Sequence, residues 1–227
     1  MWCEYELTTQ TQQWLWRIPL DPAPKRSLPV LEERPRWTDL GAARCEGCPL
    51  AGNDDDACPA AVAVMDVVAG LKDVASIDAV DVVVRMPERE VRKRTTGANA
   101  ARSVFGLLMA TSGCPVLEVM RPLARHHLPF ATEEEFLFRL VGLHLLQSWF
   151  SAGGSLSDGV VSPVSLQQLP AYLSRLQAVN TAFAARLRKA VKGDAGPNAV
   201  CQLFSLSVGA RYDVDDGLVS LRAFVGG

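Results

Sequence analysis

Long apolar runs, an excess of one charge and a secretion signal are all missing from this sequence. Its 227 residues carry a formal net charge of -2, which gives no general attraction to nucleic acid or to an anionic membrane surface. No stretch reaches the roughly 18 uninterrupted apolar residues of a membrane-spanning helix. Residues 1–5 lack the basic start and apolar run of a signal peptide. We therefore expect a cytoplasmic protein that binds neither membrane nor nucleic acid.

Familiar catalytic motifs are also missing. The sequence contains no G-x-S-x-G, P-loop, G-x-G-x-x-G, H-E-x-x-H or paired-acid motif. Histidine occurs only 3 times, whereas cysteine occurs 6 times. A reaction mechanism would have to start from a cysteine thiolate, so the sequence leaves open whether the protein is an enzyme.

Hydrophobic patterning predicts an α+β fold in which helices predominate. A β-friendly segment at 1–7 and alternating apolar residues at 13–20 predict an N-terminal β-hairpin. Segments 79–86 and 90–95 predict a second hairpin, with a solvent-facing edge strand. Both hairpins should pack on a bundle of about six helices. Helical periodicity predicts helices at 59–74, 98–111, 114–125, 132–150 and 169–192, followed by a last pair at about 198–212 and 215–224.

We expect one domain over residues 1–227. Residues 1–57 would form the hairpin, a proline-rich irregular arm at 21–37 and a cysteine-containing loop, and residues 58–227 the mainly helical body. The helix that follows Thr132 is apolar on nearly every side, which predicts that it is central and buried.

Proline follows three of the six cysteines: Cys48, Cys58 and Cys114. With 14 prolines in 227 residues, such a neighbour is rare by chance. A residue before proline is extended, and proline favours the first turn of a helix, so the thiol faces free helix N–H groups and the positive end of the helix dipole. This environment stabilises the thiolate, which is the form that binds metals.

With Cys45, these cysteines provide four sulfur ligands for a metal site. Cys45 and Cys48 form a C-x2-C motif, Cys58 is close in sequence and Cys114 is distant. Four thiolates match a tetrahedral zinc ion or a four-iron cluster. The Cys-Pro steps favour an iron–sulfur cluster, because bacterial ferredoxin motifs end in Cys-Pro and an anionic cluster gains from helix N-termini. Zinc is the alternative, and either centre would be structural or redox-sensing.

Basic residues follow Cys114 between two prolines. Arg121, Arg125, His126 and His127 are candidates for hydrogen bonds to the metal ligands, and either histidine could replace a sulfur. The same residue types are also expected at a helix C-terminus, where they cap free carbonyls.

Other uses of the cysteines stay open. Cys45 and Cys48 could form a redox or regulatory thiol pair. Cys114 with His126 or His127 could serve a thiol-dependent enzyme. In the simplest case Cys58 and Cys114 are small buried caps, and Cys45 and Cys48 lie in a loop without a role. Cys201 is expected to be a core residue.

An interaction module without metal is a further alternative. Trp14 and Trp16 on the N-terminal hairpin, or the long helix from Leu169, could bind a second copy of the chain or another protein partner. Metal content of the purified protein separates this alternative from the metal-site hypothesis.

Several segments resemble an uncharacterised bacterial family of unknown function. They are Cys45-x2-Cys48-Pro-Leu, Cys58-Pro-Ala-Ala, Met109-Ala-Thr-Ser-Gly-Cys114-Pro and Arg121-Pro-Leu-Ala-Arg-His-His-Leu-Pro-Phe-Ala-Thr-Glu-Glu134. The resemblance spans most of the chain and includes Trp37-Thr38, Asn180 and Arg186. It implies that these segments act as a unit, and it implies no activity.

Overall fold

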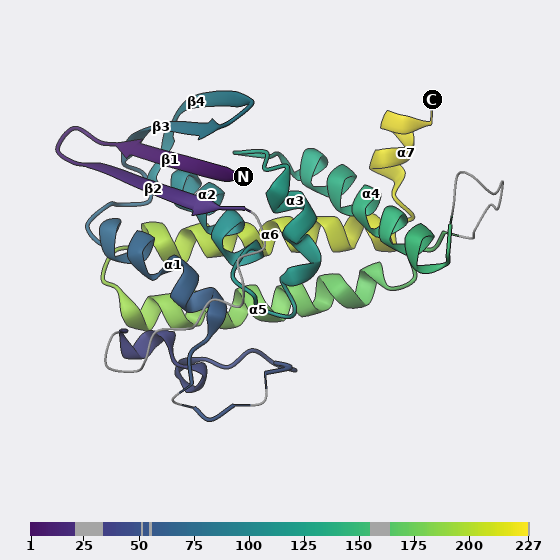
Figure 1. Cartoon of the computed structure of the whole chain (residues 1–227), viewed down its shortest axis with the longest axis horizontal. Helices are drawn as coiled ribbons and strands as arrows, with labels where there is room; N and C mark the ends of the chain where they lie inside the picture. Colours follow the sequence, from purple (N-terminus) through teal and green to yellow (C-terminus); the bar gives the residue numbers. More distant parts are fainter. Residues whose placement is uncertain (21–33, 51, 55, 155–163, 227) are drawn as a thin grey trace.

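A computed structural model of the chain describes residues 1–20, 34–50, 52–54, 56–154 and 164–226. Within these ranges it contains seven α-helices and one four-stranded antiparallel sheet. The predicted fold class, α+β with helix predominant, is therefore confirmed. The sheet lies at one end of two long helices, α5 and α6, which run side by side (Figure 1).

Both predicted hairpins are present, and they join in a single sheet. β1 (Trp2–Thr8) pairs with β2 (Gln13–Pro19), and β3 (Ala79–Met86) pairs with β4 (Arg89–Thr96). β1 also pairs with β3, which gives the strand order β2-β1-β3-β4. β4 is an edge strand whose residues are mostly exposed, as predicted.

Alternation along the strands gives the sheet one buried face and one polar face. The inward side chains of the two central strands are at most 1% exposed, and they are Cys3, Tyr5, Leu7, Val80, Val82 and Val84. Burial of such side chains contributes about 1.5–3 kcal/mol each. The inward face therefore supplies most of the stability that the sheet gains from the helices beneath it.

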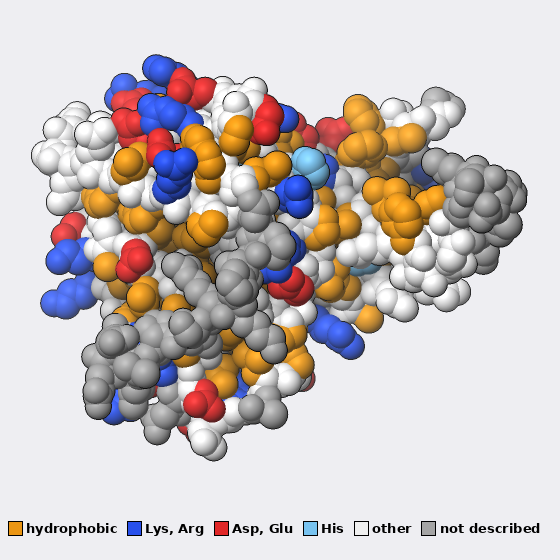
Figure 2. Space-filling view, in the orientation of Figure 1, with side chains coloured by type: hydrophobic (Ala, Val, Ile, Leu, Met, Phe, Trp, Pro, Cys, Tyr) orange, Lys and Arg blue, Asp and Glu red, His pale blue; other side chains and the backbone are white. Residues whose placement is uncertain are grey.

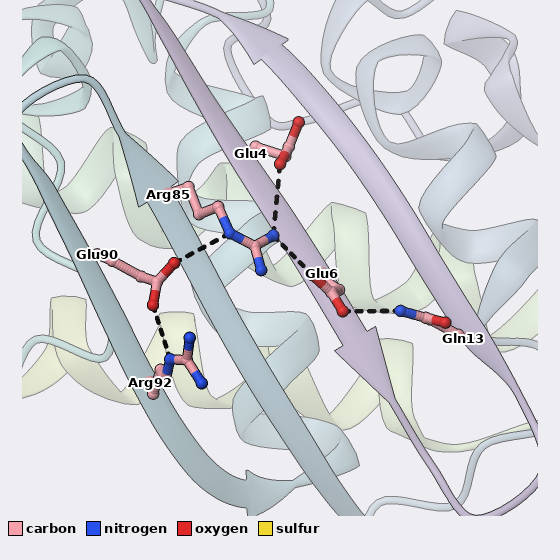
Figure 3. Close-up of polar contacts among 6 residues, drawn as sticks. All are labelled: Glu4, Glu6, Gln13, Arg85, Glu90 and Arg92. Atoms are coloured by element: carbon pink, nitrogen blue, oxygen red, sulfur yellow. Dashed lines mark hydrogen bonds and ion pairs between the residues drawn. The ribbon is translucent and has the colours of Figure 1, made fainter.

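On the outer face, ion pairs connect three strands (Figure 3). The Arg85 guanidinium lies 2.6 Å from the Glu6 carboxylate and 3.0 Å from that of Glu90, which in turn lies 2.7 Å from Arg92. Exposed ion pairs of this kind contribute about 0–1 kcal/mol each. They favour the register of the strands and add little to the stability of the fold.

The helices differ in length and in their place in the core. Their bounds are α1 Pro59–Gly70, α2 Gly97–Ala110, α3 Arg121–Arg125, α4 Glu133–Ser151, α5 Leu169–Ala190, α6 Ala195–Asp215 and α7 Val219–Val225. α6 packs against both α2 and α5 at the centre. Phe105 on α2 is fully buried, and Phe183 on α5 is 2% exposed.

The prediction that the helix after Thr132 is central and buried is wrong. Its capping box is present, with Thr132 and Glu135 bonded reciprocally. On this helix, α4, Leu140 is fully buried, but Leu146 is 57% exposed and Phe150 is 66% exposed. α4 packs on α3, α6 and α7 at one end of the molecule, so its neighbours cover only one side of it. Figure 2 shows hydrophobic side chains on the surface at this end.

The prediction of a single helix from Cys114 to Arg125 is also wrong. A turn follows Cys114, and then come the 3-10 helix η4 (Glu118–Met120) and the five residues of α3. Pro122 has no N–H to donate to the carbonyl of Glu118, which explains why a continuous α-helix cannot pass this point.

The predicted proline-rich arm lies mostly outside the described residues, and its described end forms the 3-10 helix η2 (Arg36–Thr38). A second 3-10 helix, η3 (Leu40–Ala42), follows directly. Among the described helices, none combines the length and the apolar character that crossing a membrane requires.

Candidate functional site

One buried arginine on α5 anchors the segment 34–58, here called the cysteine loop. Arg186 is 2% exposed. Its guanidinium donates hydrogen bonds to the backbone carbonyls of Trp37, Asp39 and Ala43, at 2.8 Å for Ala43. One side chain thus satisfies several carbonyls that would otherwise be buried without donors, and it fixes the loop just before Cys45.

The cysteine loop is also bonded to itself. Arg34 forms a buried ion pair with Asp39 and donates to the Thr38 hydroxyl at 2.8 Å. The Cys58 N–H donates to the Thr38 carbonyl at 2.8 Å. These bonds hold the two ends of the loop together, so the described loop residues return to the start of α1.

Cys45 and Cys48 lie on one tight turn. The Cys48 N–H donates to the Cys45 carbonyl at 3.1 Å. Gly47 has φ +65°, a left-handed conformation that glycine adopts without strain. The turn therefore brings both thiols of the C-x2-C motif to the same short segment.

Cys58 is the N-cap residue of α1, as predicted. Pro59 occupies the first turn, and the Val62 N–H donates to the Cys58 carbonyl at 3.0 Å. The thiol is half-buried and packs against the core. It lies at the positive end of a helix of 12 residues.

Cys114 gains backbone donors from a turn instead of a helix. It follows Gly113, which has φ +83°. Its carbonyl accepts hydrogen bonds from the N–H groups of Leu117 and Glu118. Burial raises the pKa of the Cys114 thiol, whereas hydrogen bonds from the backbone of Leu117 and Val116 lower it. The donors predicted around this sulfur are thus present, although the long helix is not.

The four predicted ligands lie in one neighbourhood. The pKa of Cys45 is raised to about 12, first by burial and then by the nearby Cys58, Cys48 and Cys114. Cys58 and Cys48 likewise raise the pKa of Cys114. Such charge–charge effects fade within roughly 10 Å. The fold therefore brings together cysteines from three separate segments of the chain.

These thiols do not form a ready coordination sphere. Among the described residues, no group of three or more Cys, His, Asp or Glu side chains is arranged to hold a metal ion. With raised pKa values, Cys45 and Cys114 are protonated near pH 7, and a metal would have to displace their protons.

Two side chains of α5, for which the sequence predicted no role in the site, lie near the thiols. Arg186 lowers the pKa of Cys45. Tyr172 is 8% exposed, its pKa is raised by burial and by Cys114, and its hydroxyl has no hydrogen-bond partner in the described structure. Buried hydroxyl groups are nearly always bonded. No local pattern marks Tyr172, because its proximity to Cys114 comes from the packing of distant segments.

The predicted basic residues after Cys114 have contacts elsewhere. Arg121 pairs with Glu118 at 2.8 Å, and Arg125 is exposed in the last turn of α3. The His126 carbonyl accepts a hydrogen bond from Arg139 at 2.6 Å. A second bond, to the Leu123 carbonyl at 3.0 Å, also holds Arg139.

His127 and the two other cysteines also have their contacts in other parts of the fold. His127 Nε2 lies 2.5 Å from the Tyr5 hydroxyl. Burial and the charge of Arg139 lower the pKa of His127 to about 3. Cys3 is fully buried in β1, and Cys201 on α6 is half-buried, with its sulfur 3.2 Å from an Arg188 nitrogen.

Comparison with known proteins gives a family and no activity. The family model described as Domain of unknown function (DUF6901) matches residues 3–225. This range contains Cys45, Cys48, Cys58 and Cys114. No curated protein and no solved structure matches the chain.

Proposed function

Since this chain belongs to the family described as Domain of unknown function (DUF6901), we propose its function from the chemistry of its own residues. The protein holds a metal centre on Cys45, Cys48, Cys58 and Cys114. We propose an iron–sulfur cluster, with zinc as the alternative. The centre fastens the cysteine loop to the helical body and is structural or redox-sensing.

The observation that carries the proposal is the proximity of four cysteines from three segments. Close thiols make one another harder to ionise, and the nearby cysteines raise the pKa values of Cys45 and Cys114. A bound cation removes this cost, since it replaces the protons and neutralises the thiolate charge. Four thiolates are the number and type of donors that a zinc ion or a four-iron cluster requires.

The surroundings of the sulfurs support an anionic centre. The backbone N–H groups of Val116 and Leu117 donate to Cys114, Cys58 lies at the N-terminus of α1, and the charge of Arg186 favours the Cys45 thiolate. Hydrogen bonds to sulfur and nearby positive charge set the potential of iron–sulfur clusters. These groups would therefore tune a redox centre as well as hold it.

Tyr172 supplies a further donor for such a centre. Its hydroxyl is buried near Cys114 without a partner. An unbonded buried hydroxyl costs about 1–3 kcal/mol. A thiolate or an inorganic sulfide next to Cys114 would accept this hydrogen bond, as the surroundings of metal ligands commonly require.

Cluster and zinc differ in the spacing that they require of the four sulfurs. A four-iron cluster holds its cysteine sulfurs farther apart than one zinc ion does. The distances among the sulfurs of the metal-loaded protein would therefore distinguish the two centres.

Metal analysis of the purified chain tests the proposal. Protein prepared without oxygen should contain iron and sulfide in near equal amounts and should absorb broadly in the visible range. Cys58→Ser and Cys114→Ser should lose both signals, whereas Cys201→Ser, the matched control on α6, should keep them. One zinc ion per chain without visible absorption would establish the alternative. Wild-type protein with no more metal than Cys58→Ser would refute the proposal.

A further inference from the structure

A cavity that does not include the cysteines lies among α2, α3, α4, α5 and α6. Its volume is about 130 Å³. Most of its lining is apolar, including Leu107, Met109, Leu117, Met120, Phe136 and Leu203. A cavity of about 150 Å³ with such a lining accommodates a benzene ring. The space therefore fits an apolar group of about six carbon atoms.

Some of the polar side chains of this lining already have partners. The Ser103 hydroxyl lies 2.7 Å from that of Tyr5 and accepts from the Phe130 N–H at 3.2 Å. His127 bonds to the same tyrosine, and its lowered pKa keeps the ring neutral near pH 7. Arg139 donates to the carbonyls of Leu123 and His126. These groups shape the wall and leave little bonding capacity unused.

Two other polar side chains of the lining lack partners within the described residues. Asn180 on α5 is 2% exposed, and its side-chain amide has no hydrogen bond there. Arg102 on α2 is half-buried and makes neither an ion pair nor a hydrogen bond there. Burial lowers the pKa of its guanidinium, and Glu133 offsets this only in part. A buried amide and a partly buried cation in an apolar cavity are costly unless a ligand binds them.

We propose that this cavity binds a small organic acid with an apolar tail of about six carbons. Arg102 recognises the carboxylate, Asn180 donates a hydrogen bond to an oxygen of the ligand, and the leucine, methionine and phenylalanine side chains enclose the tail. A pocket that is mostly apolar and has a few convergent polar groups is the usual form of a small-molecule site. The site is separate from the metal centre and does not depend on it.

Calorimetric titration of the full chain with octanoate tests the proposal, with 1-octanol as the uncharged analogue. Octanoate should bind saturably at one site and more tightly than 1-octanol. Arg102→Gln should weaken octanoate binding by roughly 10-fold or more, because a hydrogen bond to a charged group is lost. Arg175→Gln, the same change at an exposed arginine of α5, should leave binding unchanged.

Two further variants change the cavity without removing the charge. A Cβ added at Gly106 would lie 3.7 Å from Leu203, an ordinary contact, so Gly106→Ala should fold, stabilise α2 and weaken octanoate binding by narrowing the cavity. Asn180→Leu should stabilise the fold and weaken binding several-fold. Absence of saturable octanoate binding, or equal octanoate affinity in wild type, Arg102→Gln and Gly106→Ala, would overturn the proposal.

Discussion

Replacement of Arg186 by methionine should release the cysteine loop from α5. The change keeps the aliphatic part of the side chain and removes the donors to the carbonyls of Trp37, Asp39 and Ala43. A hydrogen bond to a charged group is worth about 1.5–3 kcal/mol, but water will reach part of the freed carbonyls. Each carbonyl that stays buried without a donor costs about 1–3 kcal/mol. We expect a loss of roughly 3–5 kcal/mol in the free energy of unfolding.

Urea unfolding followed by circular dichroism measures this loss, and Arg188→Met serves as the matched control. Arg188 is exposed on the same helix, so its replacement should change the free energy of unfolding by less than about 0.5 kcal/mol. Trypsin should also cleave within the cysteine loop sooner in Arg186→Met than in the control. Equal unfolding midpoints and equal cleavage rates for the two variants would refute the anchoring role of Arg186.

Three other predictions concern the core, the half-buried His127 and the metal. Leu140→Ala should lower the free energy of unfolding by roughly 2–5 kcal/mol, because Leu140 is fully buried. Leu146 is exposed, so Leu146→Ala should lower it by less than about 0.5 kcal/mol. Equal losses in urea titrations of the two variants would contradict the packing of α4. The pKa of His127 is lowered to about 3. Below about pH 6.5 the histidine of the unfolded chain therefore binds a proton that the histidine of the folded chain does not bind. The stability of the fold should decrease as pH falls from about 6.5 to 3. His127→Asn should weaken this dependence in unfolding measured against pH, and an unchanged slope would exclude the histidine as its source. Removal of metal by a chelator should expose segment 34–58 to proteolysis before the helical circular dichroism signal changes. If protease resistance and the helical signal were lost together, the metal would instead stabilise the whole fold.

The sequence predicts the local elements of this fold better than their arrangement. The hairpins and α5 follow from alternation and helical spacing, because both patterns are local. The pairing of β1 with β3 joins strands that are far apart in sequence, and no local pattern encodes it. The peripheral position of α4 is non-local for the same reason. A helix that is apolar all round is buried only where neighbours surround it, and which neighbours do so is decided by the packing of the other helices.

In the candidate site, too, the sequence predicts the local features but not the arrangement of distant residues. Cys58 as N-cap and the turn at Cys45 follow from Cys-Pro and C-x2-C patterns, because proline and glycine act on adjacent backbone. The positions of Arg186 and Tyr172 depend on how α5 packs against the cysteine loop and Cys114, so neither role could be predicted. No continuous helix forms between Cys114 and Arg125, although the spacing of apolar residues predicts one, because Pro122 interrupts the helical hydrogen bonds.

X-ray absorption spectroscopy at the metal edge of the purified, oxygen-free protein tests the central claim most directly. It reads the identity and the distance of the atoms bound to the metal. Ligation by Cys45, Cys48, Cys58 and Cys114 predicts a first shell of sulfur alone at about 2.3 Å, with iron neighbours beyond it for a cluster and none for zinc. A first shell dominated by nitrogen or oxygen, or one that is unchanged in Cys114→Ser, would contradict the four-cysteine centre.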